Sequence, residues 1–443
     1  MTTEPAIERL RALLRIPTVS RNTAAEVDWS QFERFRDALV EAFPLVHAKL
    51  EREIVDGHSL LYRWPGTGVG DPSVLMAHQD VVPADESGWQ HPAFGAELVG
   101  SGEDTRIWAR GTLDDKGMLC SILEAVESRL AAGFQPAADV YLSFSHDEET
   151  TGTGAPAAVD LLLSRGVRPG LVLDEGGAVV EGIFPGVRGQ IAVVGVSEKG
   201  QVGIELVVEK KGGHASTPAR DGATARLARA ITRLEERPSR ATMSEPNLAM
   251  ISTLGGRATG PTGFILRRAR FFRPLLTQVL ARLGPETNAV VRTTRAVTRL
   301  TGSAGDNVIA ERATAMVNVR IAVGSSVEEA TRDIRTAIDD PSVQVNVVYG
   351  ADPAPVSPSH GAAWNTLAAA IDDVFPGALV TPYVMLQASD SRHFARISEN
   401  VYRFLPFDLS AAERGTLHAK DESIRVSTYL RAIAFFDRLI GAL

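Results

Sequence analysis

The chain has 443 residues, more than one hydrophobic core usually supports, so we expect two domains. Apolar residues make up 44% and charged residues 23%, as in an ordinary globular protein, and the formal net charge of −8 disfavours nucleic acid as the main partner. The single cysteine, Cys120, excludes an internal disulfide and a thiolate metal cluster. A transition metal would therefore have to bind histidine and carboxylate side chains.

Membrane and export signals are the next feature of the sequence. No apolar run approaches the roughly 18 residues of a membrane-spanning helix. The first five residues are polar and acidic, with neither the basic nor the apolar region of a signal peptide. We therefore expect a cytoplasmic protein without a membrane span.

The first 200 residues alternate between helices and strands. The hydrophobic spacing predicts helices over 4–15, 28–43, 119–130 and 155–165, and strands over 50–55, 59–64, 74–78, 107–113, 140–145 and 171–173. Such alternation is typical of an α/β fold with a mainly parallel sheet and helices on both faces.

A different pattern begins at about residue 198. It predicts strands over 202–208, 289–300, 312–323 and 343–349, with helices over 222–236 and 326–338. The order β-α-β-β-α-β is typical of a ferredoxin-like sheet with helices on one face. We therefore predict a larger domain formed by residues 1–197 and 351–443, interrupted by an inserted α+β domain at 198–350.

Within that insertion, residues 257–283 are rich in arginine, phenylalanine and leucine. Contact with a membrane or a partner is one interpretation of such a stretch. A helix packed on its own domain is the interpretation we favour.

Polar side chains follow several of the predicted buried strands. His78 and Asp80 end the first, and residues two apart share one face of a strand. An imidazole beside a carboxylate is typical of a metal ligand held by its partner, although a surface hydrogen bond is a common alternative. Asp114 follows the next strand, where two adjacent acids could also be a helix cap.

The same pattern recurs further along the chain. Glu148 and Glu149 follow the strand at 140–145, Asp174 ends the strand at 171–173, and His418 lies near the C-terminus. The carboxyl edge of an open α/β sheet is where ligands bind. Two histidines and three acids (His78, Asp114, Glu149, Asp174 and His418) suit a pair of zinc, cobalt or manganese ions bridged by one carboxylate. We assign the bridge to Asp114 and a general-base role to Glu148.

These motifs resemble those of the co-catalytic zinc peptidases that include carboxypeptidase S, carboxypeptidase G, aminoacylase, carnosinase and succinyl-diaminopimelate desuccinylase. They are the runs at residues 76–80, 111–117, 146–149, 173–177 and 212–218, in the family's order. The carboxypeptidase S branch, with its N-acyl-amino-acid hydrolase relatives, is the most similar. His146 and the run at 390–394 point to that branch.

The resemblance implies a role for each residue. One zinc ion would be held by His78, Asp114 and Asp174, and the other by Asp114, Glu149 and His418, while Asp80 orients His78 and Glu148 acts as base. The inserted domain would be a lid and dimerisation module, and His214 would stabilise the oxyanion in the partner subunit's site. Asn307 and Arg320 would bind substrate, the arginine through a carboxylate, and Arg392 is a competing carboxylate ligand. Ala388 and Ala419 replace glycines that are usual in the family.

We therefore expect a dimeric di-zinc hydrolase that cleaves the amide bond next to a free carboxylate in small peptides or N-acyl amino acids. An aminoacylase-like activity is the nearest alternative. A two-metal phosphoesterase would need basic phosphate ligands, and only Lys116 lies near in sequence. A non-catalytic binding protein of the same fold would be expected to lack a ligand or the base, and none is missing.

Overall fold

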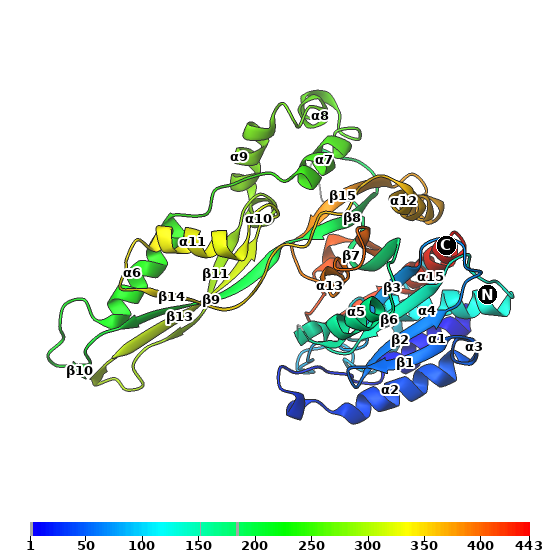
Figure 1. Ribbon diagram of the computed structural model, residues 1–443, viewed down its shortest axis with the longest axis horizontal. Helices are drawn as coiled ribbons and strands as arrows, with labels where there is room; N and C mark the ends of the chain where they lie inside the picture. The colour runs from blue at the N-terminus through cyan, green and yellow to red at the C-terminus, as the bar shows by residue number, and fades with distance from the viewer. Residues whose placement is uncertain (1–2, 151, 183–185) are drawn as a thin grey trace.

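The computed structural model describes residues 3–150, 152–182 and 186–443. Two bodies lie side by side, a larger one built on a wide sheet and a smaller, elongated one that projects from it (Figure 1). Two segments join them, because β8 (Ile191–Glu198) of the larger sheet leads into β9 (Gly200–Glu209) of the smaller one, and β14 (Gln344–Ala351) leads back.

The larger sheet has eight strands in the order β1-β2-β6-β3-β7-β16-β8-β15. Its centre, from β6 to β16, is parallel, whereas β1 and β2 are antiparallel additions at one edge. Its remaining strands are β1 (Glu51–Val55), β2 (Ser59–Trp64), β3 (Ser73–His78), β6 (Val140–Ser145), β7 (Leu171–Val180), β15 (Leu379–Met385) and β16 (Val401–Leu409). Every residue of β3 and β6 is buried, which explains their continuous apolar runs.

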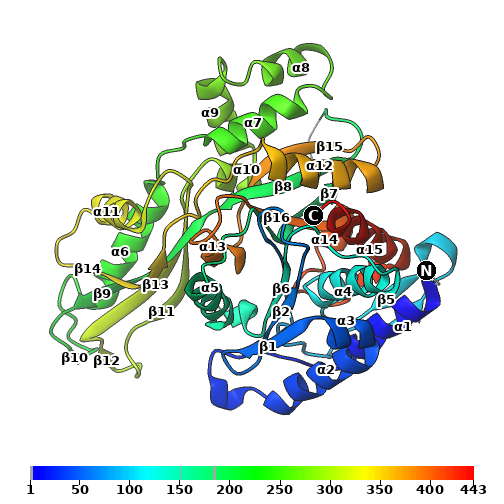
Figure 2. The ribbon, with the colours of Figure 1, turned by 45° about the vertical axis from the view of Figure 1, so that its right-hand side comes forward.

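Helices cover both faces of this sheet, as Figure 2 shows. One face carries most of the core, with α1 (Thr3–Leu14), α3 (Pro44–Lys49), α4 (Lys116–Ala131), α12 (Ala362–Val374) and α15 (Val426–Ile440). The other face has a smaller core with α5 (Gly154–Ser164) and α13 (Ser391–Phe394). Further helices are α2 (Trp29–Ala42) and α14 (Ala411–Arg414), with single turns at Ala24–Glu26, Gly102–Asp104 and Glu148–Thr150. The predicted mainly parallel, helix-flanked sheet is confirmed.

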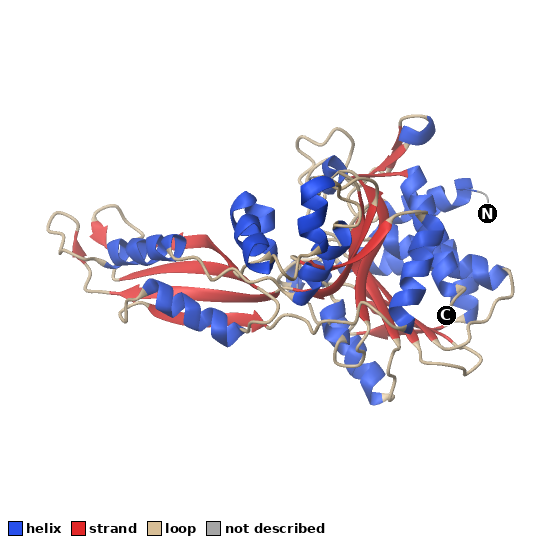
Figure 3. Cartoon of the chain, turned by 90° about the horizontal axis from the view of Figure 1, so that it is seen from above, coloured by secondary structure: helices blue, strands red, loops and turns tan. Residues whose placement is uncertain are grey.

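The smaller body is a four-stranded antiparallel sheet in the order β11-β13-β9-β14. β11 (Thr294–Thr301) and β13 (Arg312–Ile321) complete it, and α6 (Ala223–Glu236) and α11 (Val327–Ile338) share its core. Seen from above, it extends away from the larger sheet (Figure 3). Two short paired strands, β10 (Gly213–His214) and β12 (Val308–Ile309), lie at its far end (Figure 1). The chain order is the predicted β-α-β-β-α-β with these two strands added.

Two predictions of local structure were wrong. The strand predicted at 107–113 ends at Trp108, because β5 (Arg106–Trp108) belongs to a separate small sheet with β4 (Glu97–Val99) and β17 (Ser423–Arg425). The strand predicted at 289–300 begins only at Thr294, since the chain before it is helical. Asp114 therefore follows a turn beside the large sheet and not one of its strands.

Residues 245–290 form four helices between α6 and β11. They are α7 (Glu245–Leu254), α8 (Gly260–Arg267), α9 (Arg273–Leu283) and α10 (Pro285–Val290). Leu248, Ile251 and Leu276 join the core of the larger body, so this part of the chain packs on that body and not on the inserted domain that the favoured interpretation of 257–283 expected. The domain boundaries 1–197, 198–350 and 351–443 stay a prediction. Part of the middle interval packs with the larger body.

Candidate metal centre

His78 lies at the end of β3, among groups that fix its ring. Its Nε2 is 2.8 Å from Asp114 Oδ1, and its Nδ1 is 3.0 Å from the Asp80 carbonyl oxygen and 3.3 Å from Asp80 Oδ1. The Asp80 carboxylate, fully buried, also accepts hydrogen bonds of 3.2 Å from the backbone N–H groups of Glu148 and Glu149. Asp80 therefore positions both the imidazole and the segment that carries the two glutamates.

Asp114 faces a second histidine with its other oxygen. His418 Nε2 lies 2.9 Å from Asp114 Oδ2 and 3.1 Å from Glu149 Oε1. His78 and His418 come from opposite ends of the chain, and one carboxylate lies between them. This is the arrangement that a bridging ligand between two metal ions requires.

The third acid near His78 is Glu175, which follows the predicted ligand Asp174 in the sequence. Glu175 Oε1 is 3.9 Å from His78 Nε2, and His78, Asp114 and Glu175 offer ligand atoms within 4.8 Å of one another. Asp174 is buried, and its Oδ2 accepts a 2.9 Å hydrogen bond from the Ser391 N–H. The register of β7 with β16 shifts between Asp174 and Gly177, so the strand is irregular where these two acids lie.

The acidic side chains of this site lie close together and outnumber the positively charged ones. Burial raises the pKa of Glu148, Glu149 and Glu175 above the ordinary range of a glutamate, and neighbouring carboxylates add to the effect. Hydrogen bonds to Asp114 and Glu149 raise the pKa of His418 to about 10. Burial opposes protonation of His78, yet its hydrogen bonds to Asp114 and Asp80 leave its pKa well above the ordinary value.

This donor set fits a pair of divalent cations. Two histidines and three carboxylates form two groups that share Asp114, namely His78, Asp114 and Glu175, and Asp114, Glu149 and His418. Nitrogen and oxygen donors of this kind suit zinc, cobalt or manganese. Two positive ions would compensate the crowded carboxylates, which otherwise favour protonation.

Glu148 lies beside these groups and is not part of either one. Its backbone is held by Asp80, and burial of its carboxyl, followed by the charge of Asp390, raises its pKa well above the ordinary value. Burial also raises the pKa of Asp390 to about 7. A half-buried glutamate with a raised pKa next to a metal centre can accept a proton near neutral pH.

A buried ion pair behind the site was not predicted from the sequence. Arg403 in β16 donates from Nε to Glu198 Oε2 at 2.8 Å, and both side chains are at most 2% exposed. Glu198 also accepts a hydrogen bond of 3.1 Å from the Ser389 N–H. The signal that could have revealed this pair is an arginine inside the apolar run of residues 401–409.

Two residues predicted to act on substrate lie far from these histidines in their own chain. His214 belongs to β10 at the tip of the smaller body and is exposed, with Nδ1 2.8 Å from Ser216 Oγ (Figure 1). Asn307 lies at the same tip, where its carbonyl accepts a 3.0 Å hydrogen bond from the Ala215 N–H. The structure brings these two together but not to the metal centre.

Arg320 and Arg392 occupy other positions. Arg320 lies at the opposite end of β13, paired in register with Gln201 next to the junction of the two bodies. At about 3.3 Å per residue, the eight steps of β13 from Arg312 to Arg320 span roughly 25 Å. Arg392 in α13 is half-buried, and its charge lies close enough to lower the pKa of Asp390.

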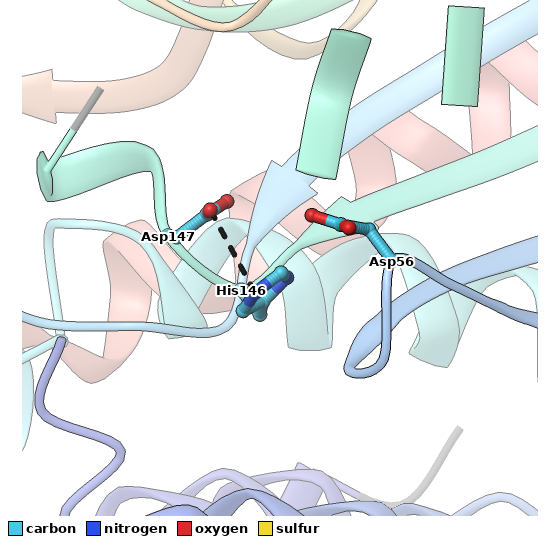
Figure 4. Close-up of side chains that lie close together, drawn as sticks. All are labelled: Asp56, His146 and Asp147. Carbon is cyan, nitrogen blue, oxygen red and sulfur yellow. Dashed lines mark ion pairs between the residues drawn. The ribbon is translucent and has the colours of Figure 1, made fainter. Parts of the chain in front are cut away.

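A further His/Asp group lies at the start of η3 (Glu148–Thr150) and α5 (Figure 4). His146 Nδ1 is 2.7 Å from Ser59 Oγ, and Asp147 accepts hydrogen bonds from the Thr153 and Gly154 N–H groups at 2.8 and 3.2 Å. Asp56 accepts one from the Thr153 hydroxyl. By accepting these hydrogen bonds, the carboxylates of Asp56 and Asp147 hold in place the segment that carries Glu148 and Glu149.

A family model for peptidase family M20/M25/M40 matches residues 74–442. Among curated proteins, the chain is 35% identical to an N-fatty-acyl-amino acid synthase/hydrolase PM20D1 of Xenopus tropicalis, covering 98% of this chain and 85% of that one. It is 33% identical to a probable carboxypeptidase S-like 2 of Dictyostelium discoideum (98% and 84% covered) and 29% identical to carboxypeptidase S of Saccharomyces cerevisiae (97% and 82%).

Solved structures share the fold across the whole chain. The M20 family metallo-carboxypeptidase Sso-CP2 of Sulfolobus solfataricus superposes with a TM-score of 0.69 at 17% identity, covering 98% of each chain. Human carnosine dipeptidase 1 superposes with a TM-score of 0.65 at 14% identity, covering 100% of this chain and 97% of that one.

Proposed function

The chain belongs to peptidase family M20/M25/M40, and from this premise we propose that it is a metal-dependent hydrolase of the carboxypeptidase S type. It cleaves the amide bond of small peptides or N-acyl amino acids next to a free carboxylate. The observation that carries the proposal is Asp114, whose two oxygens each face a histidine, His78 on one side and His418 on the other. An aminoacylase-like preference for N-acyl amino acids is the second candidate, favoured by the relative that is named for N-fatty-acyl-amino acids.

We assign one metal to His78, Asp114 and Glu175, and the other to Asp114, Glu149 and His418. Zinc is the metal we propose, with cobalt or manganese as substitutes that the same donors accept. When bound, the two ions polarise the scissile carbonyl and lower the pKa of water at the site. Glu175 replaces Asp174 in this assignment because it is the acid whose carboxylate lies near His78.

Glu148 is the proton acceptor in this proposal. It is half-buried and precedes the proposed ligand Glu149, and Asp80 holds the backbone of both residues. It takes a proton from the attacking water and passes it to the nitrogen of the leaving amine. Asp80 is a positioning residue, because it acts through His78 and through this backbone.

His214 and Asn307 act in trans in this proposal, in a dimer formed through the smaller body. Both lie at its tip, away from the histidines of their own chain, so a contribution to catalysis requires a partner subunit. His214 would stabilise the oxyanion and Asn307 would contact substrate. Arg320, at the junction of the bodies, is the candidate for the substrate carboxylate, with Arg392 as the competing one.

The experiment compares wild type and Glu148→Gln after zinc loading, on a panel of dipeptides and matching N-acyl amino acids. Release of the free amine is measured. We expect kcat to fall by about 10²–10⁴-fold with little change in bound metal. Equal rates for the two proteins would refute the assignment of the base, and cleavage of no amide at all would refute the activity.

The compartment and the dimer are separate points. Among the described residues, no helix combines the length and the hydrophobicity needed to cross a membrane. The cytoplasm remains the predicted location. The dimer remains a proposal that rests on the position of His214.

A further inference from the structure

The segment between Glu245 and Glu286 has a charge opposite to that of the whole chain. It contains no aspartate, glutamate or lysine but six arginines, Arg257, Arg267, Arg268, Arg270, Arg273 and Arg282, in a chain with a net charge of −8. In the fold this segment forms most of α7 together with α8 and α9, which project above the larger sheet (Figure 1). A local excess of positive charge of this kind attracts anionic partners.

Large apolar side chains are exposed on the same helices. The exposed fractions are 79% for Phe271, 63% for Leu283, 54% for Leu275, 48% for Phe264 and 46% for Val279. Residues 271, 275, 279 and 283 are spaced by four, so they form one stripe along and just before α9. Exposed apolar residues that cluster in this way mark an interaction surface.

The inner side of α8 and α9 packs against the protein and holds this stripe in place. Ala269, Leu276 and Thr277 are buried, and the Phe272 ring packs edge-on against Phe271 with 5.0 Å between ring centroids. Arg273 donates hydrogen bonds to Glu245 and to the Met243 carbonyl. The stripe is therefore the outer face of a packed helix.

Some of the arginines are exposed at the edge of the stripe. Arg268 is exposed and lies over the Phe264 ring at 4.0 Å. Arg282 is exposed and shares the last turn of α9 with Leu283. Arg270 keeps 81% of its side chain exposed although it pairs with Glu245. Guanidinium groups that border an apolar stripe match a surface with anionic headgroups above apolar tails.

We propose that the face formed by α8 and α9 docks the protein on an anionic lipid surface. The apolar stripe enters the boundary between headgroups and acyl chains, while Arg268, Arg270 and Arg282 face the headgroup charges. A second copy of the chain across a two-fold axis fits this face less well, because it would place arginines against arginines. This inference does not depend on the amide chemistry of the metal centre.

The test is co-sedimentation with vesicles of phosphatidylcholine alone or with added phosphatidylglycerol. We expect the wild type to bind only the anionic vesicles and to be released by salt. The double variant Phe271→Ser/Leu275→Ser should bind about tenfold more weakly or worse. The matched control, Ile54→Ser/Val69→Ser, removes two exposed apolar side chains from the larger body, 48% and 68% exposed, and should bind as the wild type does.

Three results would overturn the proposal. One is a wild type that binds neither kind of vesicle, and another is equal binding by the Phe271/Leu275 variant. The third is a change from dimer to monomer in that variant, seen by sedimentation velocity, which would make the face a contact between copies. Hydrolysis of a small soluble dipeptide should be the same in all three proteins, which separates failure of docking from failure of the proposed activity.

Discussion

The choice between Glu175 and Asp174 gives the sharpest test of the metal centre. Both acids lie in β7, one after the other, at a point where the register of β7 with β16 shifts. Glu175 lies 3.9 Å from His78 Nε2, whereas Asp174 accepts a hydrogen bond from the Ser391 N–H. We predict that Glu175→Gln removes a metal ligand and that Asp174→Asn does not.

The expected sizes of the two effects differ widely. Changes to residues that only support a ligand already cost about 10–100-fold in metal affinity, so loss of the Glu175 carboxylate should exceed about 100-fold for one of two ions. In Asp174→Asn the amide oxygen can still accept from Ser391. A neutral hydrogen bond replaces a charge-assisted one at a cost of about 1 kcal/mol, or less than about tenfold in affinity.

The assay is a metal titration against a chelator of known affinity, with bound metal counted per chain by mass spectrometry. Wild type and Asp174→Asn should each bind two ions tightly, and Glu175→Gln should bind one tightly and one weakly. Far-ultraviolet circular dichroism checks that all three proteins are folded. The reverse order, with Asp174→Asn losing the metal, would refute the geometry of β7 described above.

Three further predictions concern the metals, the lid and the fold. Removal of metal by a chelator should abolish amide hydrolysis, and added zinc, cobalt or manganese should restore it; unchanged rates after chelation would exclude the metal mechanism. His214→Ala should lower kcat by about 10²–10³-fold, and mixing it with Glu148→Gln should restore about a quarter of wild-type activity through hybrid dimers with one complete site; no recovery would argue against action in trans. Burial raises the pKa of Glu413, but its hydrogen bonds with Ser410 and Arg425 outweigh this and lower the pKa from 4.5 to about 2, so its contribution to stability is present above pH 4.5 and lost as the pH falls toward 2. Urea unfolding should show that Glu413→Gln lowers the free energy of unfolding by about 1–2 kcal/mol at neutral pH and that this difference from wild type disappears near pH 2. A difference that does not change with pH would contradict the prediction.

The sequence predicted most of the ligands because they follow buried runs. His78 ends β3 and Glu149 follows β6, which are buried along their whole length, and adjacent parallel strands bring such ends together. Asp114 and His418 follow turns instead, and periodicity alone could not place them. The sequence singled out Asp114 through a predicted strand at 107–113 that ends at Trp108 in the structure, and His418 through its place near the C-terminus.

The sequence favoured Asp174 over Glu175 for a physical reason. The strand continues through Leu173, Asp174, Glu175 and beyond to Val180, so neither acid stands at its end. Which face of β7 meets His78 depends on the register with β3, and that register is set by packing on both faces of the sheet. A sequence in which both faces are buried does not contain that information.

The buried pair of Glu198 and Arg403 connects the metal centre to the smaller body. Glu198 is the last residue of β8, and only Lys199 separates it from β9 of the smaller sheet. The same carboxylate accepts from Ser389, and Ser391 in turn donates to Asp174 next to the ligand Glu175. A rotation of the smaller body about this junction would therefore move Glu198 against a hydrogen-bonded segment that touches β7.

An arginine and a glutamate buried at this position cost desolvation energy that an apolar pair would avoid. Their presence is explained if the orientation of the two bodies and the position of the metal-binding acids have to be held together.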